Sequence, residues 1–266
     1  MNSKVSRSTR YRMLSPAPHS TLRLTLRPKW ERWINLCLDQ PCLVCGDLSK
    51  IQAGLCETCD YSLPWQPPGC QRCGVSPDER PPTQWTCDLC DADEPDFRRC
   101  HSLFRYAPPL NTLIGRLKDR AGFAEARTLG SLLAREFERH YRDSAQPLPA
   151  LLAPVPLHPE RLRLRGYNQS HLLAQAVSAR TGVKVLSNSC QRRSQAHSQR
   201  GLDASTRRAN TAGMFAVSAR SRLTSGRQVA IIDDVVTTTS TIRAMARVLR
   251  HAGAGPIDVW ALARAN

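Results

Sequence analysis

The 266-residue chain contains no uninterrupted apolar run near the roughly 18 to 20 residues that a membrane-spanning helix needs. Its first residues also lack the succession of basic, apolar and small-residue segments that defines a secretory signal. These absences predict an intracellular protein without a membrane span. We expect it in the cytoplasm, where thiols remain reduced.

Aromatic residues are sparse, at 6% of the chain, and Tyr167 and Phe215 are the nearest in sequence to its most basic stretches. This scarcity disfavours a surface that binds nucleic acid mainly by stacking on the bases. No grouping of His, Cys and Asp in the sequence indicates nucleophilic catalysis.

Acidic residues are outnumbered, with 22 Asp and Glu against 38 Lys and Arg and a formal net charge of +16. The excess predicts a polyanionic partner or substrate, and nucleic acid, a phosphorylated metabolite and an anionic membrane surface all fit. Residues 1–29 contain no acidic residue and show no steady period, so we expect residues 1–36 to form a disordered basic tail. A transit peptide and a start at Met13 are the alternatives.

Cysteine is abundant: ten of the eleven cysteines lie within residues 37–100, which are otherwise rich in proline and poor in periodicity. Eight of them form the four Cys-x-x-Cys knuckles CLVC (42–45), CETC (56–59), CQRC (70–73) and CDLC (87–90). Each knuckle can offer two thiolates to one tetrahedral metal ion, so four knuckles make two sites. Disulfides are rare in a compartment that keeps thiols reduced, so we expect these cysteines to bind metal. The spacing therefore predicts a module of two structural zinc sites over residues 37–100.

The sequence leaves the pairing of the knuckles open. In the simplest pairing, Cys42, Cys45, Cys56 and Cys59 bind one zinc ion and Cys70, Cys73, Cys87 and Cys90 bind the other. The Pro-rich LPWQPP segment favours this tandem arrangement. An interleaved pairing stays open, because the second and third knuckles are separated by as many residues as the first and second. Cys37, Cys100 and Cys190 are left over, and we expect them to be core or surface residues.

From Leu103 onward, helices and strands are predicted to alternate. The expected helices fall within 110–142, interrupted near Gly122, and at 168–180 and 240–252; the expected strands are 183–186, 229–232 and 257–263, with a short apolar run at 151–157. This order predicts an α/β domain over residues 101–266, with a largely parallel sheet flanked by helices. Residues 190–213 are polar and basic, and a connection of that length is typical of a functional or mobile loop.

The segment VAIIDDVVTTTST (229–241) places two adjacent aspartates where a buried strand is predicted to end. At that end of a parallel sheet, where ligands bind, Asp233 and Asp234 can accept hydrogen bonds from ribose hydroxyls or hold Mg²⁺. Five hydroxyl residues within 237–241 then open a helix, whose N-terminal N–H groups form an anion site. Sugar hydroxyls beside a phosphate describe a ribose 5-phosphate, whereas two exposed aspartates that cap a helix are the plainer alternative.

This segment resembles the phosphoribosyl-pyrophosphate (PRPP) loop of type I phosphoribosyltransferases. From about Cys42 to its end, the chain resembles the ComF/GntX family, proteins associated with natural competence and DNA uptake. The stretches that carry the resemblance are the paired zinc knuckles, PVPLHPERLRLRGYNQ (154–169), RRSQAHSQRGLDASTRRANTAGMF (192–215), the loop itself and the closing DVWALAR.

The resemblance implies a type I phosphoribosyltransferase-like domain behind a small double zinc ribbon, and binding of PRPP with Mg²⁺. The implied PRPP site consists of Asp233, Asp234, Val235, Thr237, Thr238, Thr239, Ser240, Thr241 and Arg165, with the aspartates in the catalytic position. A second loop, around Pro156–Glu160, would hold pyrophosphate. Lys118 occupies a family-like lysine position, and it fits a helix surface equally well.

Two groups of arginines are predicted to contact pyrophosphate or single-stranded nucleic acid, because the guanidinium fork suits phosphate oxygens. They are Arg161, Arg163, Arg192, Arg193, Arg200, Arg207 and Arg208. For Arg161, Arg163 or Arg165 taken alone, a solvated position on a basic face is an equally good interpretation.

Two positions depart from the family pattern, with Thr239 in place of Gly and Ala196 in place of Thr. Glycine allows positive φ and close approach to the phosphate, so Thr239 predicts weaker or differently shaped phosphate binding.

Two hypotheses follow from the resemblance. In the first, the protein binds PRPP in natural competence, with single-stranded DNA and competence proteins as partners. In the second, it is an active phosphoribosyltransferase, of the glycosyltransferase class, that displaces pyrophosphate from PRPP with a nucleobase or another acceptor. The polar, basic stretch at 190–213, where a base-binding hood would be expected, favours the first.

Overall fold

The computed structural model describes residues 41–48, 50–77, 81, 84–119, 122–186, 190–192, 214–217 and 226–265. The predicted tail, Cys37, Ala196 and four of the predicted contact arginines (Arg193, Arg200, Arg207 and Arg208) lie outside these residues. Within them, no helix is long and apolar enough to cross a membrane.

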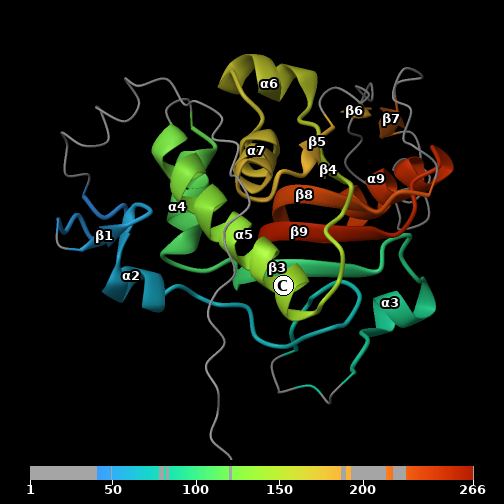
Figure 1. Cartoon of the computed structure of the whole chain (residues 1–266), viewed down its shortest axis with the longest axis horizontal. Helices are drawn as coiled ribbons and strands as arrows, with labels where there is room; N and C mark the ends of the chain where they lie inside the picture. The colour runs from blue at the N-terminus through green and yellow to red at the C-terminus, as the bar shows by residue number, and fades with distance from the viewer. Residues whose placement is uncertain are drawn as a thin grey trace, which may run out of the picture. The chain divides into compact units, whose positions relative to one another are not determined.

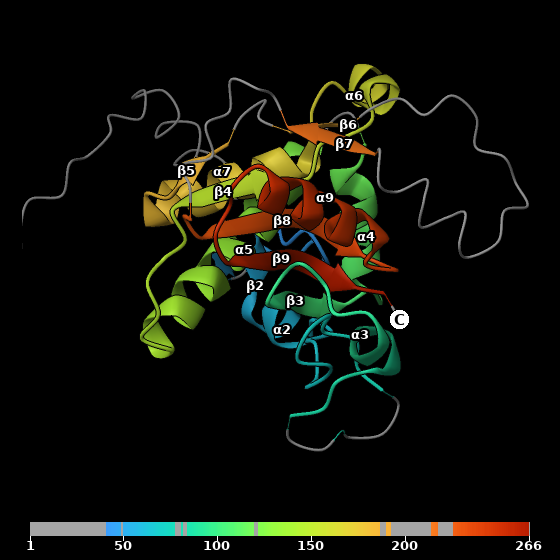
Figure 2. The ribbon, with the colours of Figure 1, turned by 90° about the vertical axis from the view of Figure 1, so that its right-hand side faces the viewer.

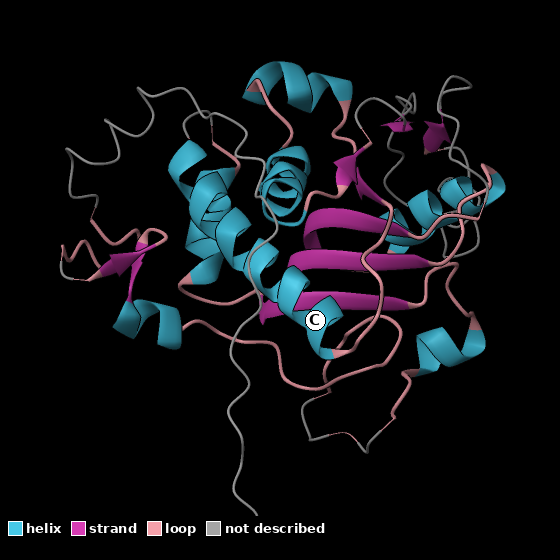
Figure 3. Cartoon of the chain, in the orientation of Figure 1, coloured by secondary structure: helices cyan, strands magenta, loops and turns pink. Residues whose placement is uncertain are grey.

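Strands and helices alternate over most of the described chain (Figures 1 and 3). In order along the chain they are β1 (Ile51–Gln52), β2 (Leu55–Cys56), α2 (Glu57–Tyr61), α3 (Asp88–Ala92), β3 (Arg99–Arg105), α4 (Leu110–Leu117), α5 (Phe123–Asp143), β4 (Leu151–Pro154), α6 (Pro159–Arg165), α7 (Gln169–Thr181), β5 (Lys184–Val185), β6 (Cys190–Arg192), β7 (Phe215–Val217), β8 (Val229–Val236), α9 (Ser240–His251) and β9 (Ile257–Arg264).

Five strands form one sheet in the order β3-β9-β8-β4-β5, and every neighbouring pair is parallel. The central strands are buried on both faces: side chains of β8 and β9 alternate between two cores. Ile232 and Trp260 pack with α4, α5 and α7, whereas Ile231 and Val259 pack with α9. Figure 2 shows α9 on one side of the sheet and α5 and α7 on the other. The predicted fold class, a parallel sheet flanked by helices, is confirmed.

The predicted end of strand 229–232 is wrong. β8 continues to Val236 because its second half keeps pairing with β9, from Asp233 opposite Ala261 to Val236 opposite Arg264. Asp233 and Asp234 therefore lie inside the strand instead of in a turn beyond it.

The cysteine-rich segment packs against the α/β part. Leu55, Leu63 and three cysteines of its first two knuckles belong to the same core as α4 and α5, and Trp65 forms an isolated bridge with Phe104 of β3. The division of the chain at residue 100 stays a prediction.

Candidate ligand site and metal centres

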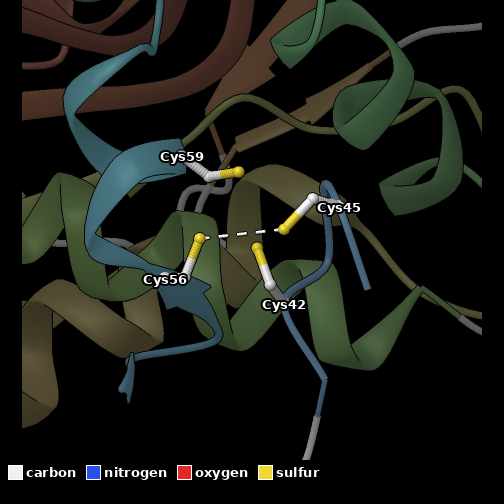
Figure 4. A group of neighbouring side chains, drawn as sticks. All are labelled: Cys42, Cys45, Cys56 and Cys59. Atoms are coloured by element: carbon white, nitrogen blue, oxygen red, sulfur yellow. Dashed lines mark hydrogen bonds between the residues drawn. The ribbon is translucent and has the colours of Figure 1, made fainter. Parts of the chain in front are cut away.

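The eight knuckle cysteines form two separate groups of four, and their grouping is sequential. Within each group the sulfur atoms all lie within 4.8 Å of one another. Figure 4 shows the four sulfurs of the first group turned toward a common centre, with Cys45 Sγ and Cys56 Sγ 3.7 Å apart. In the second group Cys73 Sγ and Cys87 Sγ are 3.6 Å apart. A tetrahedral four-thiolate zinc site, with Zn–S bonds of about 2.3 Å, has sulfurs about 3.8 Å apart, so both groups fit zinc.

The two groups have the same local construction. In each, the glycine after the first knuckle donates its backbone N–H to the first cysteine carbonyl, Gly46 to Cys42 and Gly74 to Cys70, both at 2.9 Å. Gly46 and Gly74 have φ of +80° and +70°, the conformation that favours glycine in this turn. Burial raises the pKa of Cys42, but backbone N–H groups around its sulfur outweigh burial and lower the pKa to about 6. The turn thus favours the thiolate that binds metal.

Cys100 and Cys190 stand apart from both groups. Burial raises the pKa of Cys100 to about 12 and that of Cys190 to about 11, so both remain thiols.

Asp233 and Asp234 are buried, with 7% and 5% of their surface exposed, and both meet the first residues of α7. Ser170 Oγ donates to Asp233 Oδ1 at 3.0 Å, and the backbone N–H of Asp234 donates to the same oxygen at 2.9 Å. Asp234 Oδ2 lies 3.0 Å from Lys118 Nζ and accepts a longer hydrogen bond, 3.4 Å, from Gln169 Nε2. The carboxylates are therefore held in fixed positions by side chains from distant parts of the chain.

Burial, together with the negative charge of Asp234, raises the pKa of Asp233 well above its ordinary value. Two neighbouring buried carboxylates, of which only Asp234 has a lysine within 4 Å among the described residues, cost the fold stability. Such a cost at the central strand of a parallel sheet is typical of a functional site.

Besides its contact with Asp234, Lys118 is held in place by the end of its own helix. It caps the C-terminus of α4, and Tyr167 fixes that end by donating its hydroxyl to the carbonyls of Leu117, at 2.6 Å, and Asp119. Arg165, which the resemblance includes in the PRPP site, donates a hydrogen bond to Gln169 Oε1 at 2.5 Å. Gln169 therefore links Arg165 to Asp234.

The hydroxyl-rich loop 237–241 joins β8 to α9. Thr237, Thr238 and Ser240 are exposed, and the hydroxyls of Thr238 and Ser240 are 2.9 Å apart. The first turn of α9 contains no acidic residue, so α9 itself would not repel an anion at its start, and the anion site at 237–241 stays a prediction. A cavity of about 500 Å³ beside the loop, between α3 and α9, is lined in part by Thr238, Ser240 and Arg243.

Thr239 stands where the resemblance implies a glycine, and its backbone has the conformation that favours glycine. Its φ is +60°, which is a strained value for a β-branched residue. Arg243 Nε donates to Thr239 Oγ1 at 3.2 Å, which helps to hold the strained residue.

Replacing Thr239 by glycine is expected to give a more stable protein than replacing it by alanine, by about 1 kcal/mol. Both variants lose the bond to Arg243, but only glycine adopts positive φ without strain. Denaturant unfolding of the two variants measures the difference. Equal stability would mean that the loop carries no strain at this residue.

One of the predicted contact arginines lies near the carboxylates. Burial and the nearby Arg161 lower the pKa of Arg192, while the charge of Asp233 raises it, so Arg192 lies within electrostatic range of both Arg161 and Asp233. Arg192 also lies 6.0 Å from the ring centre of Phe215. Arg161 and Arg163 belong to α6, a helix with no buried residue that begins in the predicted pyrophosphate loop.

Three residues that organise the site were not predicted. Ser170 opens α7 without a motif of its own, and Arg243 has the periodicity of an ordinary helix surface. Arg264 ends the apolar run of β9, and a charge at the end of a buried strand is the signal that could have revealed it.

The fold and the cysteine groups define a class: an α/β protein with a parallel sheet, a buried carboxylate pair on its central strand and two four-cysteine centres. No family model matches the chain. It is 35% identical over 225 residues to competence protein F from Haemophilus influenzae, covering 84% of this chain and 96% of that protein. It is 32% identical over 211 residues to the DNA utilization protein YhgH from Escherichia coli K12, covering 79% and 90% respectively. The chain belongs to the competence protein F family.

Among solved structures, the adenine phosphoribosyltransferase of Leishmania tarentolae has a TM-score of 0.34 and 13% identity, covering 52% of this chain and 70% of that one. A likeness this slight carries no inference about ligand or reaction.

Proposed function

We propose that this protein binds PRPP together with Mg²⁺ and acts in the uptake or utilisation of DNA. The observation that carries the proposal is the buried pair Asp233 and Asp234, placed directly before an exposed, hydroxyl-rich helix start. The carboxylates can accept hydrogen bonds from the hydroxyls of a ribose, and the helix start can hold its 5′-phosphate. The role in DNA uptake rests on the names of the relatives, competence protein F and DNA utilization protein.

Each residue has a defined part in this binding mode. The carboxylates accept hydrogen bonds from the ribose 2′- and 3′-hydroxyls, which favours their ionised forms when the ligand is bound. The N–H groups of residues 239–241 and the hydroxyls of Thr237, Thr238 and Ser240 surround the 5′-phosphate. Lys118 and Arg192 supply positive charge near the carboxylates, and Arg161 adds to the charge around Arg192, on the side we assign to pyrophosphate.

Magnesium fits the donor set, since carboxylate and ligand phosphate oxygens are its preferred partners. When bound, Mg²⁺ would neutralise charge on the pyrophosphate, and Asp233 and Asp234 are the side chains in reach of it.

The direct experiment is a calorimetric titration of the purified protein with PRPP, with and without Mg²⁺. One saturable site that requires Mg²⁺ supports the proposal, and no heat of binding in either condition overturns it. Release of pyrophosphate with a panel of nucleobases would show in addition that the protein is an active transferase.

The basic residues near the site are proposed to contact single-stranded DNA. Replacing Arg161 and Arg192 by alanine is expected to weaken binding of oligothymidine and to lower the slope of log affinity against log salt by about 1.4, which is about 0.7 per lost phosphate contact. Fluorescence anisotropy over a range of salt concentrations measures both. The matched control is Arg180→Ala, which removes an equal charge from an arginine that already pairs with Glu138 at 2.5 Å. An unchanged slope in the double variant would contradict the contact.

A further inference from the structure

The second cysteine group is joined to the hydroxyl-rich loop by two arginines from different elements. The first is Arg264 at the end of β9, whose side chain is buried. Its Nε donates to the carbonyl of Cys73 at 3.3 Å. Its Nη1 donates to the carbonyl of Val236 at 3.1 Å and also contacts the carbonyl of Thr237. One guanidinium thus connects the CQRC knuckle to the point where the loop begins.

The second is Arg243, in the first turns of α9, with 16% of its side chain exposed. Its Nη2 donates to Cys90 Sγ at 3.6 Å, and its Nε donates to Thr239 Oγ1 at 3.2 Å. Its Nη1 pairs with Asp93, at 2.8 Å from the carbonyl oxygen and 3.1 Å from Oδ2. This guanidinium connects the CDLC knuckle to the point where the loop becomes a helix.

These contacts depend on the state of the sulfurs. Four thiolates around a divalent ion leave a net negative charge, for which a guanidinium within hydrogen-bond distance is a stabilising partner. Without the ion, protonated thiols offer Arg243 a far weaker acceptor, and α3, only five residues long, loses what holds it.

We infer that the second cysteine group, when it holds its metal, sets the conformation of the loop 237–241, and that Arg243 and Arg264 are the positioning residues that transmit it. The inference rests on the proposed function, since it assigns the metal a role in shaping the phosphate site. It also explains how Thr239 keeps a positive φ.

The first cysteine group provides an internal comparison. It contacts α4, where Arg116 Nη1 donates to the carbonyl of Leu43 at 3.1 Å, and its buried cysteines join the core of α4 and α5. Its loss is therefore expected to disturb the core without releasing the loop directly.

The first test measures the metal. Arg243→Met keeps an unbranched apolar side chain in place of the aliphatic part of arginine but removes the hydrogen bond to Cys90, and is expected to weaken zinc binding at the second group by about tenfold to a hundredfold. Competition with a chromogenic chelator measures the affinity. The control is Arg247→Met, one turn further along α9, because Arg247 pairs with Asp96 at 3.2 Å and touches neither the sulfur nor the loop. Equal zinc affinity in both variants would overturn the link.

The second test measures the loop and needs no sugar ligand. Cys87→Ser, which opens the second group, is expected to speed hydrogen exchange of the amides in 237–241 by about tenfold or more, and Cys45→Ser, which opens the first, is not. If Cys87→Ser fails to fold, Cys45→Ser is measured before and after its remaining zinc is chelated, so that only the metal of the second group changes. Unchanged exchange in the loop refutes the inference.

A titration with Mg²⁺ and PRPP separates the two proposals. If the wild-type protein binds no PRPP, the proposed function fails, and the exchange result still decides whether the metal shapes the loop. If the wild type binds and Arg243→Met binds equally well with its second site empty, the proposed function stands and the inference fails.

Discussion

Replacing both Asp233 and Asp234 by asparagine is expected to abolish detectable binding of PRPP in the presence of Mg²⁺. Each carboxylate is proposed to accept a ribose hydroxyl, and a hydrogen bond to a charged group contributes about 1.5–3 kcal/mol. Losing two of them weakens binding by roughly a hundredfold to ten-thousandfold. Calorimetric titration of the variant beside the wild type measures the loss.

The same substitution is expected to leave the chain folded, which separates a binding defect from a folding defect. Asparagine Oδ1 can still accept from Ser170 Oγ and from the backbone N–H of residue 234, as Asp233 Oδ1 does. The charge, however, is gone. The pKa of Asp233 is raised in the folded protein. The contribution of Asp233 to stability is therefore fully present below about pH 3.9, the ordinary pKa of aspartate, and is lost as the pH rises through the raised pKa of the folded protein.

Asp233→Asn alone should therefore be more stable than the wild type at neutral pH, with a difference that shrinks in acid. A gain in stability together with a loss of binding is typical of a residue kept for its ligand. A variant that loses stability at neutral pH and binds PRPP normally would contradict both statements.

Asp258 offers the matched control, because it is also a buried carboxylate and lies on the neighbouring strand. It accepts from Arg98 Nη2 at 2.6 Å, Tyr141 Oη at 3.0 Å and Gln228 Nε2 at 2.9 Å. In register it pairs with Ala230, near the other end of β8 from the hydroxyl loop. Asp258→Asn is expected to cost about 1–2 kcal/mol of stability, since the charge that pairs with Arg98 is lost but the Arg98 side chain is 45% exposed and screened by water, and to leave PRPP affinity unchanged.

The local features of this protein could be predicted from its sequence. Regular Cys-x-x-Cys spacing predicted the cysteine groups, and Gly182 and the run 257–263 placed the end of α7 and the last strand within one or two residues. These signals are local, because a knuckle, a cap or a buried strand needs only neighbouring residues to form. The sequential grouping was one of two pairings with equal spacing, and only the folded arrangement selects it.

The partners of the carboxylates could not be predicted, because they are brought together by packing. Lys118 lies 116 positions before Asp234, and it reaches the site only because Tyr167 holds the end of α4. In the sequence, Arg243 has the position of an ordinary helix-surface residue, and Arg264 has that of a residue at the end of a strand. Each of them contacts a knuckle more than 150 positions away in the sequence. The burial of Asp233 and Asp234 inside β8 was missed because two adjacent charges normally end a strand prediction.

Removing the metal from both cysteine groups is expected to lower the melting temperature by about 10 °C or more, because metal binding to a four-thiolate site adds its free energy to folding. Elemental analysis of the untreated protein should find about two zinc ions per chain. Calorimetric scans before and after treatment with a chelator measure the change. A treated protein that is free of zinc and melts at the original temperature would contradict a structural role.

The two groups should differ in what their loss does. Cys42, Cys56 and Cys59 are buried in the main core, whereas the second group forms a small cluster of its own with Val75 and Trp85. Cys56→Ser is therefore expected to reduce the free energy of unfolding of the whole chain, while Cys87→Ser acts mainly on the segment around it and on the loop 237–241. Cys190→Ser is the control, because Cys190 belongs to neither group and should leave the zinc content at two. If Cys56→Ser and Cys190→Ser unfold at the same denaturant concentration, the first metal contributes nothing to the core, and the ribbon would be an attachment to the fold instead of part of it.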